Sequence, residues 1–344
     1  MSSTQNVAEI LLNLAKDISI SGNEKSFTDK IKSYFANEEM NCDALNSLRV
    51  QTYGTGKFKF LLDAHIDQIG LIVTDITENG FIKVASIGGV DSRILSSCDV
   101  LIKSRGKDYK GVVSSIPPHL SERKEGTASE VSDLLIDIGL SKTEAEKVVR
   151  RGDVVAFNYP CEKLINEKVV SASLDNKVGV TVLIRVYQIL KEMKADADVT
   201  FVFSSQEELG LRGAKCASFN QDADEAIVVD VSFSTAPDVN NVDGKDMGKG
   251  PLICVSPIID KKISDNMISV SEEKQIPYQI EVCSKSTGTN ADVVSVSNYG
   301  IKTGLVSVPI RNMHTFSEVV SLEDIELSAK LIAEYILKKV KEHD

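Results

Sequence analysis

The sequence lacks the features of a membrane or nucleic-acid-binding protein. Its apolar runs are of strand length or carry charges, so none predicts a membrane span. It has no block of basic residues, and 50 Asp and Glu outnumber 39 Lys and Arg, which gives a net charge of −11. Because such a chain repels phosphate groups, we expect neither nucleic acid nor an anionic membrane as a partner. The first residues lack the basic segment and apolar core of a signal peptide, so we expect none.

Cysteine pairs and histidines are also scarce. The six cysteines are scattered and form no Cys-x-x-Cys pair, which argues against a thiolate zinc site or a disulfide framework. Such cysteines are typical of a reducing compartment, so we expect a cytoplasmic protein. The four histidines are His65, His119, His314 and His343. We expect His119 to be structural and His343 to be solvated, which leaves two imidazoles for chemistry.

The 344 residues have the composition of a globular protein, with 42% hydrophobic and 26% charged residues. This length suggests one large domain or two unequal ones. Periodicity of 3.6 predicts helices over 7–17, 25–35, 174–191 and 322–341. Apolar runs predict strands at 57–64, 199–204, 225–231, 251–257, 278–283 and 304–308. Helices alternating with apolar strands indicate a three-layer α/β domain.

The residue pattern changes between about 68 and 158, where short strand-like segments alternate with turns that contain glycine. The dipeptide Asn79-Gly80 between two such segments predicts a hairpin. A charged stretch at 117–129 predicts an exposed loop, and 141–150 a short helix. We therefore predict a β-rich insertion over 69–160 within a larger domain formed by 1–68 and 161–344.

Polar residues with metal-binding side chains follow the apolar strands. They lie at the ends of strands or at the start of the helix over 174–191, and they are His65, Asp67, Asp175, Glu207, Glu208, Asp230 and His314. Because ligands bind at the carboxyl ends of parallel strands, these groups could converge there. Each also has an ordinary interpretation, such as a solvated surface pair or a helix cap.

Two histidines among several carboxylates suit a pair of divalent cations. Zinc and cobalt accept imidazole nitrogen and carboxylate oxygen, and one carboxylate can bridge two cations. A further carboxylate that binds no metal can take and return the proton of the attacking water. The adjacent Glu207 and Glu208 can point in different directions, so one can be a ligand and the other a base.

The sequence resembles the M42 metallo-aminopeptidases, which include glutamyl aminopeptidases and tetrahedral (TET) peptidases. Nearly the whole chain carries the resemblance. The matching segments are LLDAHIDQIGLIVTDITENGFIKVASIGGVD, GVVSSIPPHL, LLIDIG, SASLDNKVGV, SSQEELGLRGA, VVDVS, STGTNAD and VPIRNMHT followed by SEVVSLEDIE.

The resemblance implies a role for each site residue. His65, Asp175 and Asp230 would hold one metal ion. Asp175, Glu208 and His314 would hold the other. Glu207 would be the general base and Asp67 would orient the ring of His65. The family also suggests a strained, possibly cis, peptide between Asp175 and Asn176.

The resemblance further implies a fold, an activity and an assembly. The fold would be a three-layer αβα hydrolase-like peptidase domain with an inserted small β-barrel, similar to a PDZ domain. The activity would be removal of N-terminal residues from short peptides, with two Zn²⁺ or Co²⁺ ions per subunit and Mn²⁺ as another candidate. The barrel would mediate self-association, with twelve subunits built from dimers around a tetrahedral chamber. The sequence does not decide three points: whether the protein is a dimer or a dodecamer, which metal is native, and which N-terminal residue is preferred.

Two departures from the family pattern and three rival functions stay open. Asn290 stands where the family commonly has Asp, which would remove a charge near the substrate cleft, and Val231-Ser232-Phe233-Ser234 replaces a frequent Thr-His after Asp230. Arg311 could pair with an acidic substrate or with neighbouring carboxylates. The rivals are a two-metal N-acyl amino acid deacylase, a two-carboxylate glycoside hydrolase that needs no metal, and an inactive shell-forming protein.

Overall fold

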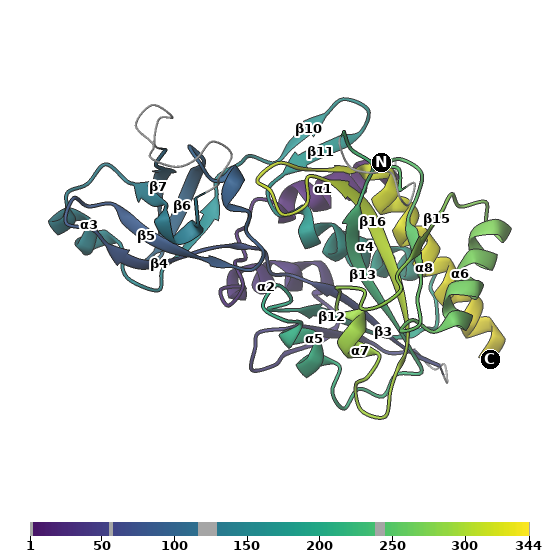
Figure 1. Cartoon of the computed structure of the whole chain (residues 1–344). Coiled ribbons are helices and arrows are strands. Elements are labelled where there is room, and N and C mark those ends of the chain that lie inside the picture. Colours follow the sequence, from purple (N-terminus) through teal and green to yellow (C-terminus); the bar gives the residue numbers. More distant parts are fainter. Residues whose placement is uncertain (1–2, 55–57, 116–128, 238–244, 344) are drawn as a thin grey trace.

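The computed structural model describes residues 3–54, 58–115, 129–237 and 245–343. Most of them surround an 11-stranded mixed sheet (Figure 1). The strands at its centre run parallel, and they are β12 (Asp198–Ser204), β3 (Lys59–His65), β13 (Glu225–Phe233) and β16 (Lys302–Arg311). These are four of the predicted apolar strands. Their burial on both faces explains why they read as continuous apolar runs.

The outer strands are shorter, and several were not predicted. At one side β2 (Leu48–Thr52) pairs antiparallel with β12, and β1 (Glu39–Cys42) pairs with β2. At the other side β17 (Glu318–Ser321), β11 (Lys168–Ser171) and β10 (Glu162–Leu164) continue the sheet from β16. The predicted strands β14 (Leu252–Val255) and β15 (Gln279–Val282) branch from β16. The missed strands are three to five residues long, too short for a clear apolar period.

Helices cover both faces of the sheet, which confirms the predicted three layers. One face carries α1 (Ser3–Leu14), α2 (Lys25–Lys32), α4 (Leu174–Glu192), α6 (Lys261–Glu273) and α8 (Leu322–His343). The other face carries the short helices α5 (Arg212–Ala217) and α7 (Ala291–Val294). Alternate residues of β3 serve the two cores: Leu62 packs in the first and Leu61 in the second. This alternation fixes which residues of a strand face the site.

The predicted β-rich insertion forms a closed barrel beside the sheet (Figure 1). Its strands are β4 (Gly70–Ile76), β5 (Ile82–Ile87), β6 (Asp99–Ser104), β7 (Lys107–Val113), β8 (Leu135–Asp137) and β9 (Val154–Phe157), and it carries α3 (Lys142–Val148). The hairpin predicted at Asn79-Gly80 joins β4 to β5, and Gly80 has the positive φ of 87° that favours glycine. The domain limits at 69 and 160 stay a prediction. The predicted loop, apart from Ser129, and His119 lie outside the described residues.

Three further features concern the expectations on membranes, cysteines and His343. In the described part of the chain, every helix is too short or too polar to cross a membrane. The six cysteines all lie within the described residues, and none of them forms a disulfide bond. The ring of His343 is exposed, as predicted, and it stacks on Phe58 with 4.5 Å between ring centroids.

Truncation of a central core residue should destabilise the fold. Leu62 is fully buried in β3, three residues before His65. Leu62→Ala leaves a cavity, and we expect a loss of about 2–5 kcal/mol in the free energy of unfolding, measured by urea denaturation. The control Val296→Ala, at a side chain that is 72% exposed, should stay within about 0.5 kcal/mol of the original protein. Equal midpoints for both variants would contradict the assigned core.

Candidate active site

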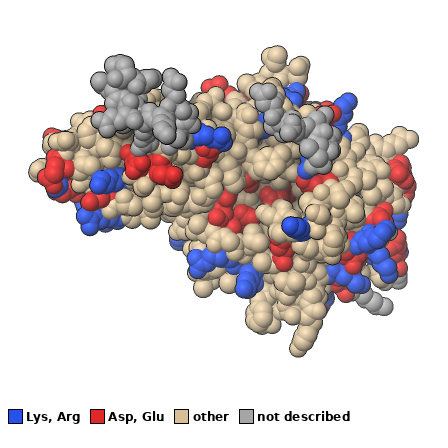
Figure 2. Space-filling view, in the orientation of Figure 1, with Lys and Arg blue, Asp and Glu red and all other residues tan. Residues whose placement is uncertain are grey.

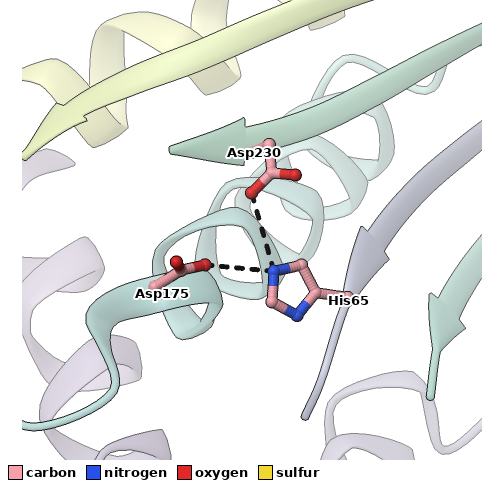
Figure 3. A group of neighbouring side chains, drawn as sticks. All are labelled: His65, Asp175 and Asp230. Atoms are coloured by element: carbon pink, nitrogen blue, oxygen red, sulfur yellow. Dashed lines mark hydrogen bonds and ion pairs between the residues drawn. The ribbon is translucent and has the colours of Figure 1, made fainter. Parts of the chain in front are cut away.

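The carboxyl ends of the parallel strands bring three of the predicted residues together. His65 ends β3, Asp230 lies near the end of β13, and Asp175 is the second residue of α4. The Nε2 atom of His65 is 3.0 Å from Oδ1 of Asp175 and 3.6 Å from Oδ1 of Asp230 (Figure 3). All three side chains are buried. They form the first group of atoms that could hold a metal ion.

A second group shares Asp175 with the first. Its other oxygen, Oδ2, lies 3.2 Å from Nε2 of His314, which in turn is 3.4 Å from Oε1 of Glu208. In each group the candidate ligand atoms lie within 4.8 Å of one another. Asp175 therefore presents one oxygen to each imidazole. The five residues that the family resemblance named as ligands are brought together in the two predicted sets.

The backbone around Asp175 departs from a regular helix. The peptide bond between Asp175 and Asn176 is cis, as the family resemblance suggested. The Nδ2 atom of Asn176 donates a hydrogen bond to the carbonyl of Val229 (2.8 Å), and its Oδ1 accepts one from the amide of Gly179 (2.8 Å). These bonds tie the start of α4 to β13, the strand that carries Asp230.

Asp67 makes more contacts in the site than the predicted one with the ring of His65. The Nδ1 atom of His65 lies 3.1 Å from the backbone carbonyl of Asp67 and 3.4 Å from its Oδ1, so both parts of Asp67 can orient the ring. The carboxylate also accepts hydrogen bonds from the amides of Glu207 (2.8 Å) and Glu208 (3.2 Å) and from the hydroxyl of Ser21 (2.6 Å). Asp67 thus fixes the loop that carries both glutamates.

Glu318 is a functional candidate that the sequence analysis missed. Its buried carboxylate accepts hydrogen bonds from the amide of Asp175 (3.0 Å) and from the amide of His314 (2.8 Å). It therefore couples the start of α4 to the loop after β16, where His314 has a positive φ of 61°. The available signal was a carboxylate directly before the apolar pair Val319-Val320, four residues after His314.

The two histidines are held in a field of carboxylates. Hydrogen bonds to Asp175 and Glu208 raise the pKa of His314 to about 11. Burial lowers the pKa of His65, but the nearby carboxylates outweigh burial and leave that pKa raised. For Asp175 burial favours the neutral acid, yet the two imidazoles outweigh it and lower the pKa of the carboxyl.

 Burial and the neighbouring negative charges raise the pKa values of the other carboxyl groups of the site. Burial raises the pKa of Glu207 to about 9, and nearby Asp230 and Glu208 raise it further, although His65 opposes them. Burial likewise raises the pKa of Glu208 and of Asp230. These shifts arise because burial disfavours the charged form of each carboxyl and because the negative charges lie close together. The site would therefore be stabilised by positive charge.

The donor atoms fit divalent cations. Each group offers one imidazole nitrogen and two carboxylates, the mixture that zinc and cobalt accept. A shared carboxylate is also the usual way to hold two cations close together. The crowded carboxylates, whose charge adds to the effect of burial on the pKa of Glu207, would be neutralised by the same ions.

Both groups open into a cavity of about 350 Å³. Figure 2 shows acidic side chains gathered in a hollow at the centre of the molecule, beside the barrel. Glu207 lines this cavity but belongs to neither group of candidate ligands. The cavity wall also includes Phe233 and the ion pair of Lys245 with Glu281. The cavity volume is within the range of small-molecule sites.

The structure shows where Asn290 and Arg311 lie relative to the cleft. Asn290 is 1% exposed and does not itself line the cavity, although its neighbour Thr289 does. Its Nδ2 atom instead donates to Oδ2 of Asp63 (2.8 Å) and to Oγ of Ser204 (2.9 Å) beneath the site. Arg311 is also absent from the described cavity wall, and its Nε donates to the carbonyl of Thr235 (2.9 Å).

Glu318→Gln should loosen the site. The glutamine amide has one oxygen, so it can accept from only one of the two backbone amides and presents an NH₂ group to the other. We expect a loss of about 1–3 kcal/mol in the free energy of unfolding, because a buried donor loses its partner. Urea denaturation measures this loss. The control Glu323→Gln, at an exposed neighbour, should change little. Equal stabilities of the two variants would contradict the role of Glu318.

Comparisons with known proteins identify the family of this chain. Residues 46–331 match the family model described as M42 glutamyl aminopeptidase. A lysyl aminopeptidase of Pyrococcus furiosus is 32% identical over 89% of each chain. An aminopeptidase structure from Desulfurococcus kamchatkensis has a TM-score of 0.92 at 29% identity and covers 100% of this chain, with 99% of its own chain covered.

A third relative adds information about assembly. The Pyrococcus horikoshii TET peptidase, which can assemble into a tetrahedron or a large octahedral shell, has a TM-score of 0.84 at 30% identity, with 96% of this chain and 99% of its own chain covered. These matches span nearly the full length of both partners in each pair. On this evidence, the chain belongs to the M42 family of glutamyl aminopeptidases.

Proposed function

We propose that this M42 aminopeptidase removes N-terminal residues from short peptides and that it uses two divalent cations to do so. His65, Asp175 and Asp230 would hold one cation, and Asp175, Glu208 and His314 the other. The observation that carries the proposal is that Asp175 lies between the two imidazoles and presents one oxygen to each. When bound, the two cations supply Lewis-acid activation of the scissile carbonyl and of a water molecule.

Glu207 is the proposed proton carrier. It lines the cavity without joining either ligand group, and its amide is held by Asp67. Burial raises the pKa of its carboxyl in the cation-free protein, and bound cations would lower that pKa again, toward the range in which a carboxylate can accept a proton. Glu207 would accept the proton of the attacking water and donate it to the leaving amine.

The surrounding residues would keep the ligands in place. With Nε2 of His65 directed at a cation, Nδ1 carries the proton and donates to the carbonyl of Asp67. Glu318 would hold Asp175 and His314 at a fixed separation through their amides. We expect the free α-amino group of a peptide to lie near one of the cations or near a carboxylate of the cavity wall, which would restrict action to the N-terminus.

The cations, the assembly and the location belong to the same proposal. The donor set suits Zn²⁺ or Co²⁺, with Mn²⁺ as another candidate, and cellular availability selects among them. Self-association through the barrel, up to a dodecamer built from dimers, is supported by the TET relatives whose structures match this chain. A cytoplasmic location stays a prediction from the cysteine pattern.

The proposed base can be removed while the cation ligands remain. Glu207→Gln keeps the size of the side chain but cannot accept the proton, so we expect kcat to fall by about 10²–10⁴-fold. The measurement is cleavage of aminoacyl-p-nitroanilides by protein with its cation content determined by elemental analysis. Glu162→Gln, at an exposed position of β10, is the matched control. Near-normal turnover by a Glu207→Gln protein that holds both cations would refute the proposed role.

The same assay separates the rival functions. Cation-dependent cleavage of substrates with a free N-terminus, but not of N-acetyl-Leu-p-nitroanilide, supports the aminopeptidase. Cleavage of the blocked substrate alone would favour the deacylase. A protein that binds two cations yet cleaves none of these substrates would favour the inactive shell-forming protein, and chelator-insensitive glycoside hydrolysis would favour the glycosidase.

Cation binding should tighten as the pH rises. In the cation-free protein the neighbouring carboxylates raise the pKa of His314 to about 11, so its imidazole holds a proton that a cation at Nε2 must displace. Binding therefore releases protons, and we expect Co²⁺ affinity to increase between about pH 6 and about pH 8. Calorimetry in two buffers with different ionisation enthalpies measures the released protons. An affinity that is constant or falls over this range would contradict the assignment.

A further inference from the structure

The inserted barrel touches two of the candidate ligands through a pair of glycines. After β5 ends at Ile87, the chain passes through Gly88 and Gly89. A β-carbon at Gly89 would lie 3.0 Å from Nδ1 of His314. Among the described residues, apart from the chain neighbours of Gly89, only His314 has atoms within 4 Å of that β-carbon. A β-carbon at Gly88 would lie 2.7 Å from Cγ2 of Ile69 and 3.3 Å from both Cβ and Oε2 of Glu208. The barrel backbone is thus in direct contact with this part of the site.

The conformation of Gly89 does not explain why glycine stands there. Gly88 has a positive φ of 73°, a region in which side chains other than glycine are strained. Gly89 is not among the residues with positive φ, so its backbone would accept a side chain. The contact that a side chain at position 89 would crowd is the one with His314. Close packing on the imidazole therefore accounts for the glycine.

A second contact ties the His314 loop to the barrel. Phe316, two residues after His314, packs against the barrel core. Its ring centroid is 5.9 Å from that of Tyr159, which follows the last barrel strand. The barrel therefore contacts this loop at two points. Gly89 lies against the ring of His314, and the barrel core packs against Phe316.

The two candidate cation groups differ in how their residues are anchored. His65 and Asp230 belong to the central strands β3 and β13. Glu208 and His314 lie in the loops after β12 and β16, where regular strand pairing no longer fixes the backbone. Loop residues need packing from elsewhere to hold a ligand geometry. The barrel supplies this packing to Glu208 and His314.

We propose that Gly88 and Gly89 are positioning residues through which the barrel sets the geometry of Glu208 and His314. This inference rests on the proposed two-cation function. It states that the turn after β5 positions residues of the second group only, the group of Asp175, Glu208 and His314. A side chain at position 89 would displace the imidazole from its place beside Asp175. The first group would keep its geometry because its two other members belong to the central sheet.

The test is a Co²⁺ titration of the full-length Gly89→Ala protein after chelation, followed by calorimetry and visible absorption. We expect one of the two Co²⁺ equivalents to bind about 10–100-fold more weakly and the other to bind as in the original protein. His314→Ala serves as the reference and should affect the same equivalent. In the double variant the added loss from Gly89→Ala should disappear, because both changes act on one ligand.

Two further variants guard against an effect on folding alone. Gly106→Ala lies in the turn between β6 and β7 and has a φ of 76°, and apart from its chain neighbours no described residue lies within 4 Å of its β-carbon. It therefore reproduces the backbone strain of Gly88→Ala without the contacts to Ile69 and Glu208. Phe316→Ala releases the loop from the other side, and Tyr109→Ala, at another aromatic packed on the barrel core, is its control. We expect Gly88→Ala and Phe316→Ala to weaken the same Co²⁺ equivalent and both controls to keep two.

Each outcome separates this inference from the proposed function. An original protein that binds fewer than two Co²⁺ ions would overturn the proposed function and the inference with it. Two ions in the original protein, with unchanged or equally weakened binding of both in Gly89→Ala, would overturn the inference alone. Should Gly89→Ala fail to fold, Phe316→Ala decides the question by the same criterion.

Discussion

The carboxylate of Asp175 lies between the imidazoles of His65 and His314, and the rest of the site is arranged around it. Such an arrangement crowds negative charges that are largely removed from water, which raises the pKa of Glu207, Glu208 and Asp230. Buried charge is costly unless it is compensated. Two divalent cations would provide that compensation, and the same ions would supply the chemistry of peptide hydrolysis.

The fold meets this constraint by placing rigid elements beneath the site and supporting contacts around it. The central strands present His65 and Asp230 from neighbouring carboxyl ends, and the start of α4 places the carboxylate of Asp175 between the histidines. Asp67 and Glu318 then hold the loops through backbone amides. The supporting carboxylates therefore fix the backbone of the loops, while the candidate ligands stay available to cations.

Much of this arrangement could be predicted from the sequence, because apolar strands and the polar residues after them are local patterns. The runs that form β3, β12, β13 and β16 were predicted, and so were the five residues of the two candidate groups. The roles of Glu318 and Asn290 depend on partners distant in the sequence, Asp175 and Asp63. No local pattern encodes those contacts. The short outer strands were missed because they owe their pairing to the sheet beside them.

The central claim is that two cations share Asp175. Crystals grown from chelated protein and soaked in Co²⁺ would test it through anomalous diffraction at the cobalt edge. The account predicts two peaks roughly 3.5–4 Å apart, one beside His65 and Asp230 and the other beside Glu208 and His314, with Asp175 between them. A single peak, or two peaks that do not share Asp175, would contradict it.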